Sequence, residues 1–252
     1  MITTDHHRLL RMKPTLFISD LHLSEDAKHT TALFDHFCQT IAVHAAELYI
    51  LGDLFDVWYG DDDATPFNDH IAAQLLQLSR LGVKLHIMHG NRDFLMTKRF
   101  CQRVGANLLK DPSFYQLDSQ RVLLTHGDLL CTDDHQYLNV RRKVRHPITL
   151  ALLKCLPLSA RQAIGRHLRE DSEHQKQQKT ATIMDVNEQT VTEWFERHEV
   201  NSMIHGHTHR PNTHQHTTNQ GTATRHVLGA WYETGSYIEA MNGHLTHHTF
   251  TD

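Results

Sequence analysis

The sequence lacks any hydrophobic run close to the roughly 20 residues that an α-helix needs to cross a bilayer. Residues 1–14 contain charged side chains and histidines, but no apolar stretch long enough for a secretory signal. Cysteine is scarce as well. The four cysteines are widely separated and form no Cys-x-x-Cys pair, which excludes a disulfide framework and a zinc knuckle. We therefore expect a cytoplasmic protein in a reducing compartment.

The composition that remains is typical of a globular protein, with 39% hydrophobic and 21% charged residues. The 252 residues fit one domain, 1–252, with an insertion better than they fit two full domains. Charge is unevenly distributed: residues 135–180 contain ten lysines and arginines against three acids, a net +7 in a chain of net −4. Such a basic segment predicts an anionic partner, such as a phosphate-bearing substrate, a membrane surface or nucleic acid.

Short apolar runs alternate with helical patterns in the first half of the chain. The runs at 15–18, 48–51 and 84–88 predict buried strands, and residues 30–46 and 69–81 have apolar side chains at helical spacing. Alternation of this kind indicates a parallel sheet, whose ligand site lies beyond the carboxyl ends of the strands.

The second half of the chain predicts further strands, several of them antiparallel, around a helical insertion. A hairpin is expected at 114–125, and other strands are expected at 200–204, 225–231, 236–241 and 245–250. Residues 134–187 are helical in composition and contain the basic segment. The expected fold class is therefore α/β, a layered core with one helical insertion.

Five polar loops follow predicted strands and carry side chains of the metal-ligand type. They are Ser19-Asp20-Leu21-His22, Gly52-Asp53-Leu54-Phe55-Asp56, Gly90-Asn91-Arg92-Asp93, Thr125-His126-Gly127-Asp128 and Gly206-His207-Thr208-His209. Each loop alone is a weak signal, because a single histidine after a strand is more often structural than a ligand. All five at strand ends in one chain predict a centre for two metal ions.

The residue types suit two divalent ions about 3.5–4 Å apart, which need a bridging carboxylate and mixed oxygen and nitrogen ligands. Asp53 is the expected bridge, because Gly52 lets its backbone come close. Asp20 and His22, two residues apart at a strand end, can share one ion, Asn91 offers a neutral amide oxygen, and His126, His207 and His209 supply the remaining nitrogens. Nitrogen and oxygen ligands without thiolate favour manganese or iron.

These loops resemble the signature of the calcineurin-like metallophosphoesterase superfamily: DxH, GDxxD, GNH(D/E), a later histidine and GHxH. Longer segments are similar to the UDP-2,3-diacylglucosamine pyrophosphatase family of lipid A synthesis: ISDLHL, LGDLFDVWYGDD, MHGNRDFL, LTHGD, LCTDDHQYLNVRRKVR and IHGHTHRP. The resemblance implies a layered α/β/β/α sandwich and two divalent ions, with Mn²⁺ favoured. It also implies hydrolysis of UDP-2,3-diacylglucosamine at the α-phosphorus, giving UMP and 2,3-diacylglucosamine 1-phosphate.

The same resemblance implies roles for particular residues. Asp53, Asn91, Arg92 and His207 are expected to take part in catalysis. Asn91, Arg92, His207, Asp134, Tyr137, Ser172, Lys176 and Lys179 match substrate-contacting positions, and Trp58, Phe94 and Arg169 are expected to help line the site. The insertion at 134–187 would form a lid over the acyl chains and bring the protein to the cytoplasmic face of the inner membrane. No nucleic acid and no obligate protein partner are expected.

Arg92 departs from the common superfamily pattern. Many members have a histidine there, which protonates an alkoxide leaving group. Arginine cannot act as an acid near neutral pH, but it can clamp phosphate oxygens. The departure therefore suits a leaving group that departs as an anion, such as the phosphate monoester released from a diphosphate. The alternative is that Arg92 merely pairs with Asp93.

The insertion contains more apolar residues than a solvated lid needs: Val144, Ile148, Leu150, Leu152, Leu153, Leu156 and Leu158. We expect them to hold acyl chains, although amphipathic helices simply packed on the core remain the alternative. Two other functions also stay open, a phosphodiesterase or nuclease and a non-catalytic scaffold. Arg92 and the lack of an evident base-stacking segment argue against a nuclease. A scaffold would not need seven ligand-type residues.

Overall fold

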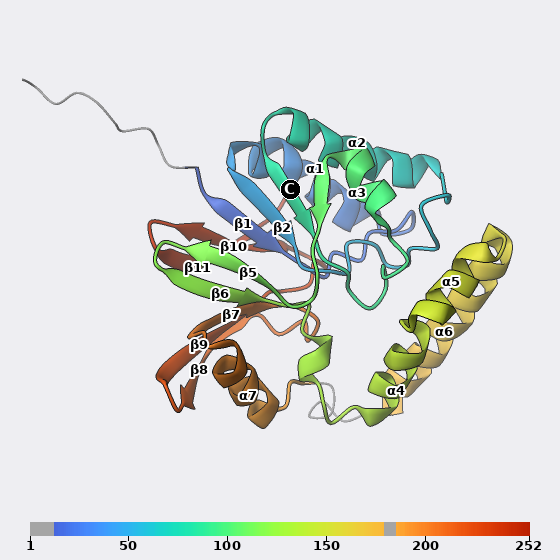
Figure 1. Cartoon of the computed structure of the whole chain (residues 1–252). Helices are drawn as coiled ribbons and strands as arrows, with labels where there is room; N and C mark the ends of the chain where they lie inside the picture. Colours follow the sequence, from blue (N-terminus) through green and yellow to red (C-terminus); the bar gives the residue numbers. More distant parts are fainter. Residues whose placement is uncertain (1–12, 179–184) are drawn as a thin grey trace, which may run out of the picture.

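The computed structural model describes residues 13–178 and 185–252, with the backbone alone for residues 170–178. Two β-sheets face each other, and helices cover their outer faces (Figure 1). The first sheet has the strand order β11-β10-β1-β2-β3-β4, and the second has the order β5-β6-β7-β9-β8. The expected layered α/β/β/α architecture is therefore confirmed.

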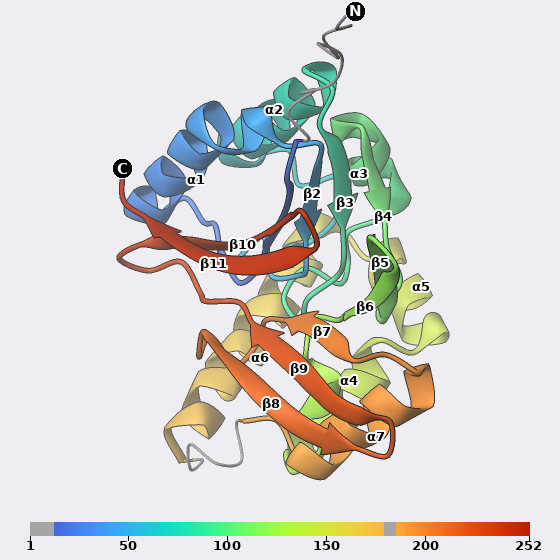
Figure 2. The same cartoon turned by 90° about the vertical axis from the view of Figure 1, so that its left-hand side faces the viewer.

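Four neighbouring strands of the first sheet are parallel, with the last of them at its edge: β1 (Thr15–Ile18), β2 (Glu47–Ile50), β3 (Lys84–Ile87) and β4 (Ala106–Leu108). Figure 2 shows the helices that connect them on the side of this sheet away from the second sheet: α1 (Lys28–Thr40), α2 (Pro66–Arg80) and α3 (Lys98–Val104). The helix α2 begins where the sequence favours it, because the Thr65 side chain accepts from Asn68 N at 3.1 Å and Pro66 occupies the first turn. The predicted strands agree with the observed ones to within one residue, whereas β4 and α3 were not predicted.

The antiparallel pair β10 (Gly235–Met241) and β11 (His244–Phe250) completes the first sheet. The second sheet contains the predicted hairpin, β5 (Ser113–Leu117) and β6 (Gln120–Leu124), and then β7 (Ser202–His205), β9 (Gly221–Val227) and β8 (Asn212–Thr218). The helix α7 (Glu188–His198) packs beside β8. The strand expected at 225–231 starts and ends earlier, and β8 was not predicted because its sequence, NTHQHTT, is polar throughout.

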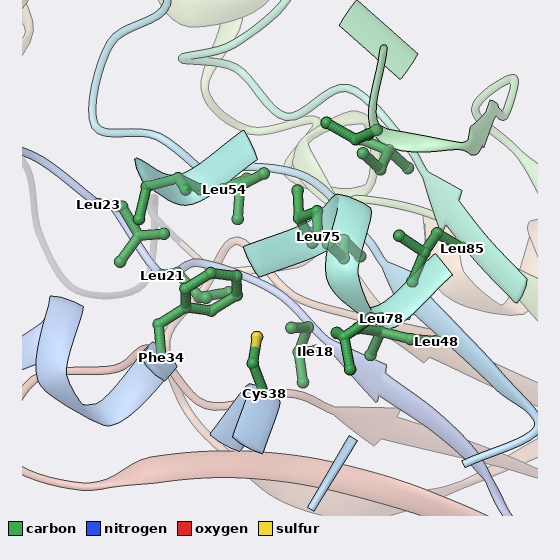
Figure 3. Close-up of a cluster of buried hydrophobic side chains, with 14 of the residues drawn as sticks. Ile18, Leu21, Leu23, Phe34, Cys38, Leu48, Leu54, Leu75, Leu78 and Leu85 are labelled. Atoms are coloured by element: carbon green, nitrogen blue, oxygen red, sulfur yellow. The ribbon is translucent and has the colours of Figure 1, made fainter. Parts of the chain in front are cut away.

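Alternating side chains of the central strands fill two cores. Ile18, Leu48 and Leu85 point toward the helices and meet Phe34 and Leu75 (Figure 3). The neighbouring positions on the same strands point toward the second sheet, where they form a cluster with it: Phe17, Tyr49, Leu124, Ile204 and Ile238. Both faces of the parallel strands are therefore buried, as their continuous apolar runs predicted.

The described part of the insertion consists of three helices, α4 (His135–Val144), α5 (Pro147–Cys155) and α6 (Leu158–Gln178). Figure 1 shows them standing apart from the two sheets. Its helical character was predicted from composition. Among the described residues, no helix is both long and apolar enough to span a membrane.

Candidate metal centre and adjoining cavity

The loops that follow β1, β2, β3, β6 and β7 meet at one edge of the two sheets. Five ligand-type residues in these loops have left-handed backbone conformations: Asp20, His22, Asp53, His207 and His209, with φ between 51° and 68°. Such a conformation costs a residue other than glycine about 1–3 kcal/mol, and it persists where surrounding structure enforces it. The concentration of this cost in one place indicates a functional site.

The first group of ligand-type atoms comes from Asp20, His22 and His209, and all of them lie within 4.8 Å of one another. The Nε2 atoms of the two histidines are 3.2 Å apart, and His209 Nε2 is 3.4 Å from Asp20 Oδ1. Asp20 Oδ1 is buried and accepts no hydrogen bond, whereas Asp20 Oδ2 accepts from Ser19 Oγ and from His207 N. An orphaned buried oxygen facing two imidazoles fits a bound cation.

The second group contains Asp20, Asp53 and His126. Asn91 Oδ1 lies 3.0 Å from both His126 Nε2 and His207 Nδ1, which adds an amide oxygen and a further imidazole. Asp53 Oδ2 is 4.0 Å from His22 Nε2 and 3.9 Å from His126 Nε2, and therefore lies between the two groups. Asp53 Oδ1 accepts from Arg92 N at 2.8 Å, which holds the carboxylate with Oδ2 toward the imidazoles of both groups.

Neighbouring backbone atoms fix the orientation of these side chains. His126 Nδ1 donates to Leu51 O at 2.9 Å, which leaves Nε2 facing Asp53. A Cβ atom at Gly90 would lie 2.1 Å from Asp53 Oδ1, and a Cβ at Gly206 would lie 2.1 Å from Asp20 Oδ2. Glycine is therefore required at both positions for the loops to approach so closely.

The electrostatics of the site favour positive charge between the ligands. Burial raises the pKa of Asp53 to about 7. The positive charge of His126 lowers this pKa, whereas the negative charges of Asp93 and Asp20 raise it. Although burial disfavours a charged imidazole, four surrounding carboxylates raise the pKa of His126 to about 9. Burial lowers the pKa of His207 to about 3, which keeps its ring in the neutral, ligating form. The donor set therefore fits two divalent cations in charge and chemistry.

Arg92 pairs with Asp56 and not with Asp93. Arg92 Nη1 donates to Asp56 Oδ1 at 2.7 Å, and Asp56 Oδ2 forms an ion pair with Arg169 of α6. Asp93 instead accepts from the backbone nitrogens of Gly90 and Leu54, at 2.7 and 3.0 Å. The alternative interpretation of Arg92 is therefore wrong, and its guanidinium lies between the metal-ligand loops and the insertion.

A cavity of about 210 Å³ separates the insertion from the core. At its polar end are Asn91 and Arg92, which adjoin the metal-ligand groups. The rest of its wall is largely apolar: Val57, Trp58, Phe94, Leu95, Val140, Val144, Leu153, Ile164 and Leu168. Tyr137 and Arg169 also line it, so four residues to which the family resemblance gave a place at the site lie around one cavity: Tyr137, Trp58, Phe94 and Arg169.

Only some apolar residues of the insertion line this cavity. Val144 and Leu153 do, and Leu150 packs against the hydrophobic core. The side chains of Ile148 and Leu152 are exposed by 65% and 64%, and Leu156 is also exposed. This outer set does not line the cavity, because α5 presents apolar residues on two opposite faces, and its role in holding acyl chains stays a prediction.

The insertion is anchored to the metal-ligand loops by contacts that the sequence did not predict. Asp128 is fully buried, and its Oδ2 accepts from Tyr137 Oη and Arg141 Nε, each at 2.5 Å. Arg145 donates to Gly90 O, next to Asn91. The available signal was the position of Asp128, two residues after His126 in the same loop.

The remaining predicted contacts lie along the insertion. Asp134 caps α4, accepting from Tyr137 N at 3.0 Å. Ser172 and Lys176 lie on α6 in the part described by its backbone alone, and Lys179 lies outside the described residues.

The chain matches the calcineurin-like phosphoesterase family over residues 13–211, and it belongs to that family. Three bacterial relatives carry the name UDP-2,3-diacylglucosamine hydrolase. The protein of Pectobacterium carotovorum subsp. carotovorum (strain PC1) is 48% identical over 89% of this chain and 94% of its own. The protein of Stutzerimonas stutzeri (strain A1501) is 47% identical over 87% of this chain and 92% of its own. The protein of Yersinia pestis bv. Antiqua (strain Angola) is 45% identical over 94% of this chain and 98% of its own.

Proposed function

We propose that this enzyme hydrolyses the diphosphate bond of UDP-2,3-diacylglucosamine in lipid A synthesis. The observation that carries the proposal is the continuity between the two metal-ligand groups, Arg92 and the apolar cavity under the insertion. A diphosphate carrying acyl chains has matching chemistry, with its anionic part at one end and its apolar part at the other. The name shared by the relatives supports this substrate.

In this proposal Asp20, His22, Asp53 and His209 hold one divalent ion, and Asp53, Asn91, His126 and His207 hold the other. Bound ions of this kind supply Lewis acidity and lower the pKa of a coordinated water toward neutrality. The protein positions the phosphorus between the two groups. Arg92 clamps the phosphate oxygens, and Asn91 and His207 touch both metal and substrate.

Further substrate contacts are proposed for the insertion. Tyr137 lines the cavity, and Asp134 caps the same helix, α4. Ser172 and Lys176 lie on α6, and the proposal also includes Lys179, which lies outside the described residues. Val144 and Leu153, together with Trp58 and Phe94, would surround acyl chains. Loss of one such aliphatic contact weakens transition-state binding by about 1–3 kcal/mol. The cavity can therefore select UDP-sugars that carry acyl chains over UDP-sugars that do not.

Arg92 also supports cleavage of a diphosphate bond rather than of an alkyl phosphodiester bond. The described geometry brings no imidazole to the Arg92 position that could protonate an alkoxide, so the leaving group must depart as a stable anion. Attack at the α-phosphorus would release 2,3-diacylglucosamine 1-phosphate, a phosphate monoester, and leave UMP. A diester with an alkyl leaving group lacks this property, which makes a general phosphodiesterase or nuclease the weaker candidate.

We propose Mn²⁺ as the ion, because three or four imidazoles with carboxylate and amide oxygens suit a first-row transition metal better than Mg²⁺. We also propose that α5 meets the cytoplasmic face of the inner membrane. Ile148 and Leu152 are exposed one turn apart, and exposed cations flank them at Lys143 and Lys154. An apolar strip bordered by cations suits an anionic bilayer surface.

Hydrolysis in water enriched in ¹⁸O tests the substrate and the bond together. UDP-2,3-diacylglucosamine, UDP-glucose and an alkyl diester would be compared with Mn²⁺ present, and the products analysed by mass spectrometry. We expect fast turnover of the diacylated substrate alone, with the label in UMP. Label in the sugar phosphate would contradict attack at the α-phosphorus, and equal rates for UDP-glucose would contradict the acyl-binding role.

A further inference from the structure

Arg225 of β9 is almost completely buried, with 2% of its surface exposed. Its guanidinium donates in three directions: Nε to His216 Nε2 at 3.1 Å, Nη1 to His205 Nε2 at 3.2 Å, and Nη2 to Glu188 Oε1 at 3.2 Å. Arginine has only donors. Both imidazole Nε2 atoms must therefore accept, and each ring has its single proton on Nδ1.

The two Nδ1 protons have acceptors of their own. His205 Nδ1 lies 2.8 Å from Gly206 O, and His216 Nδ1 lies 3.2 Å from Glu188 Oε2. One arrangement of protons therefore satisfies every ring nitrogen in the network. Arg225 and the two imidazoles are buried, whereas the Glu188 side chain is exposed at the surface. Because every ring nitrogen in the buried part has a partner, each ring is held in one orientation.

Gly206 is where this network meets the metal-ligand loop. Its carbonyl accepts from the His205 ring and also from Thr208 N at 2.8 Å. The next residue, His207, donates its backbone N–H to Asp20 Oδ2 at 2.8 Å. Rotation of the peptide after Gly206 would therefore break the contact with Asp20 and move His207 and His209.

We propose that Arg225 is a positioning residue for the metal centre. Through the His205 ring it fixes the Gly206 carbonyl, and so holds the loop whose left-handed residues His207 and His209 face the ions. The proposal rests on the proposed metal-ligand role of these histidines. Groups that orient metal ligands in this way commonly change metal affinity by about 10–100-fold when they are removed.

The test compares Arg225→Gln with His226→Asn by titration of metal-free protein with Mn²⁺ in a calorimeter. His226 is a matched control, because it is the next residue on β9, is buried to a similar extent and faces the opposite side, where it stacks with His247. We expect Arg225→Gln to bind at least one ion about 10-fold more weakly, and His226→Asn to bind like the parent. Equal affinities for the two variants, at equal loss of thermal stability in EDTA, would overturn the proposal.

Two further measurements do not depend on the Arg225 variant folding. In ¹⁵N-labelled metal-free parent protein, His205 and His216 should both show the Nδ1–H form, assigned by loss of each signal in His205→Asn and His216→Asn. An Nε2–H form of His205 would overturn the proposal. His205→Asn keeps a nitrogen near the Nδ1 position and should bind Mn²⁺ more tightly than His205→Gln; the reverse order would count against it. A parent protein that binds no metal would contradict both the centre and this proposal.

Discussion

Asp56 accepts a 2.7 Å hydrogen bond from Arg92 with one carboxylate oxygen and forms an ion pair with Arg169 of α6 with the other. This carboxylate therefore joins three parts of the molecule: the loop after β2, the loop after β3 and the insertion. Its side chain is only 12% exposed, so water screens the pairing weakly. Asp56 thus orients Arg92 at the polar end of the cavity.

The first prediction separates Asp56 from the proposed metal ligand three residues before it. Asp56→Asn keeps the shape but weakens the hold on Arg92, so we expect kcat/KM for the diacylated substrate to fall about 10-fold, or about 1.4 kcal/mol. Asp53→Asn should abolish activity, because both ions lose a ligand. Metal analysis should find two ions per chain in Asp56→Asn and fewer in Asp53→Asn. Equal metal content and activity in both variants would contradict the bridging role.

The second prediction concerns the leaving group. Arg92→His removes the clamp and restores an acid, so diphosphate hydrolysis should fall by about 100-fold, in the range lost with a charge-stabilising group. Hydrolysis of an alkyl diester should rise or stay at its low level. Arg92→Lys is the control, because it keeps the charge without the planar fork. Unchanged diphosphate turnover in Arg92→His would show that Arg92 does not touch the reacting group.

The third prediction uses two adjacent leucines of α5, of which one lines the cavity and the other is exposed. Leu153 lines the cavity, so Leu153→Glu should lower kcat/KM for the diacylated substrate by at least about 10-fold, while a water-soluble UDP-sugar is affected little. Leu152 is exposed, so Leu152→Glu should leave turnover in detergent unchanged but weaken binding to anionic vesicles in a flotation assay. The opposite pattern would contradict the assignment of the two faces.

The fourth prediction concerns the metal. Treatment with EDTA should abolish turnover, and Mn²⁺ should restore it more completely than Mg²⁺ at equal concentration, because imidazole ligands suit the transition ion. Metal-free protein should also unfold at a lower temperature, since bound ions stabilise the folded state that holds them. Full activity in EDTA would contradict the metal-dependent mechanism.

The fifth prediction concerns Asp128, which anchors α4. Burial opposes its ionised form, but the charges of His126 and Arg141 outweigh burial and hold the pKa of this carboxyl well below its usual range. The stability that ionised Asp128 contributes is therefore fully present above its pKa in the unfolded chain, about 3.9. This stability is lost as the pH falls through the pKa that Asp128 has in the folded protein. Asp128→Asn should lower the free energy of unfolding by about 3 kcal/mol at neutral pH. Urea unfolding should show this difference shrinking below about pH 4, and a constant difference would contradict the ion pair.

The sequence predicted the elements that follow simple rules. The strands β1, β2 and β3 were found because fully buried strands are continuous apolar runs, and the polar loops after them were found by their residue types. Parallel strands end at one edge of a sheet, so Asp20, Asp53 and Asn91 had to lie near one another. In contrast, β8 was not predicted, because this partly exposed strand has polar residues on both faces.

Other features depended on the tertiary structure. The sequence suggested Asp93 as a partner for Arg92, but the structure pairs Arg92 with Asp56, because Asp93 already accepts from two backbone N–H groups. Leu152 and Leu153 are alike in sequence, and only the placement of α5 against the core decides which one faces the cavity. The sequence by itself determined which chemical groups stand at the ends of the strands, because those follow from local pattern. Packing decided which groups from distant segments of the chain touch one another. A buried polar atom can bond only to the groups that packing brings next to it.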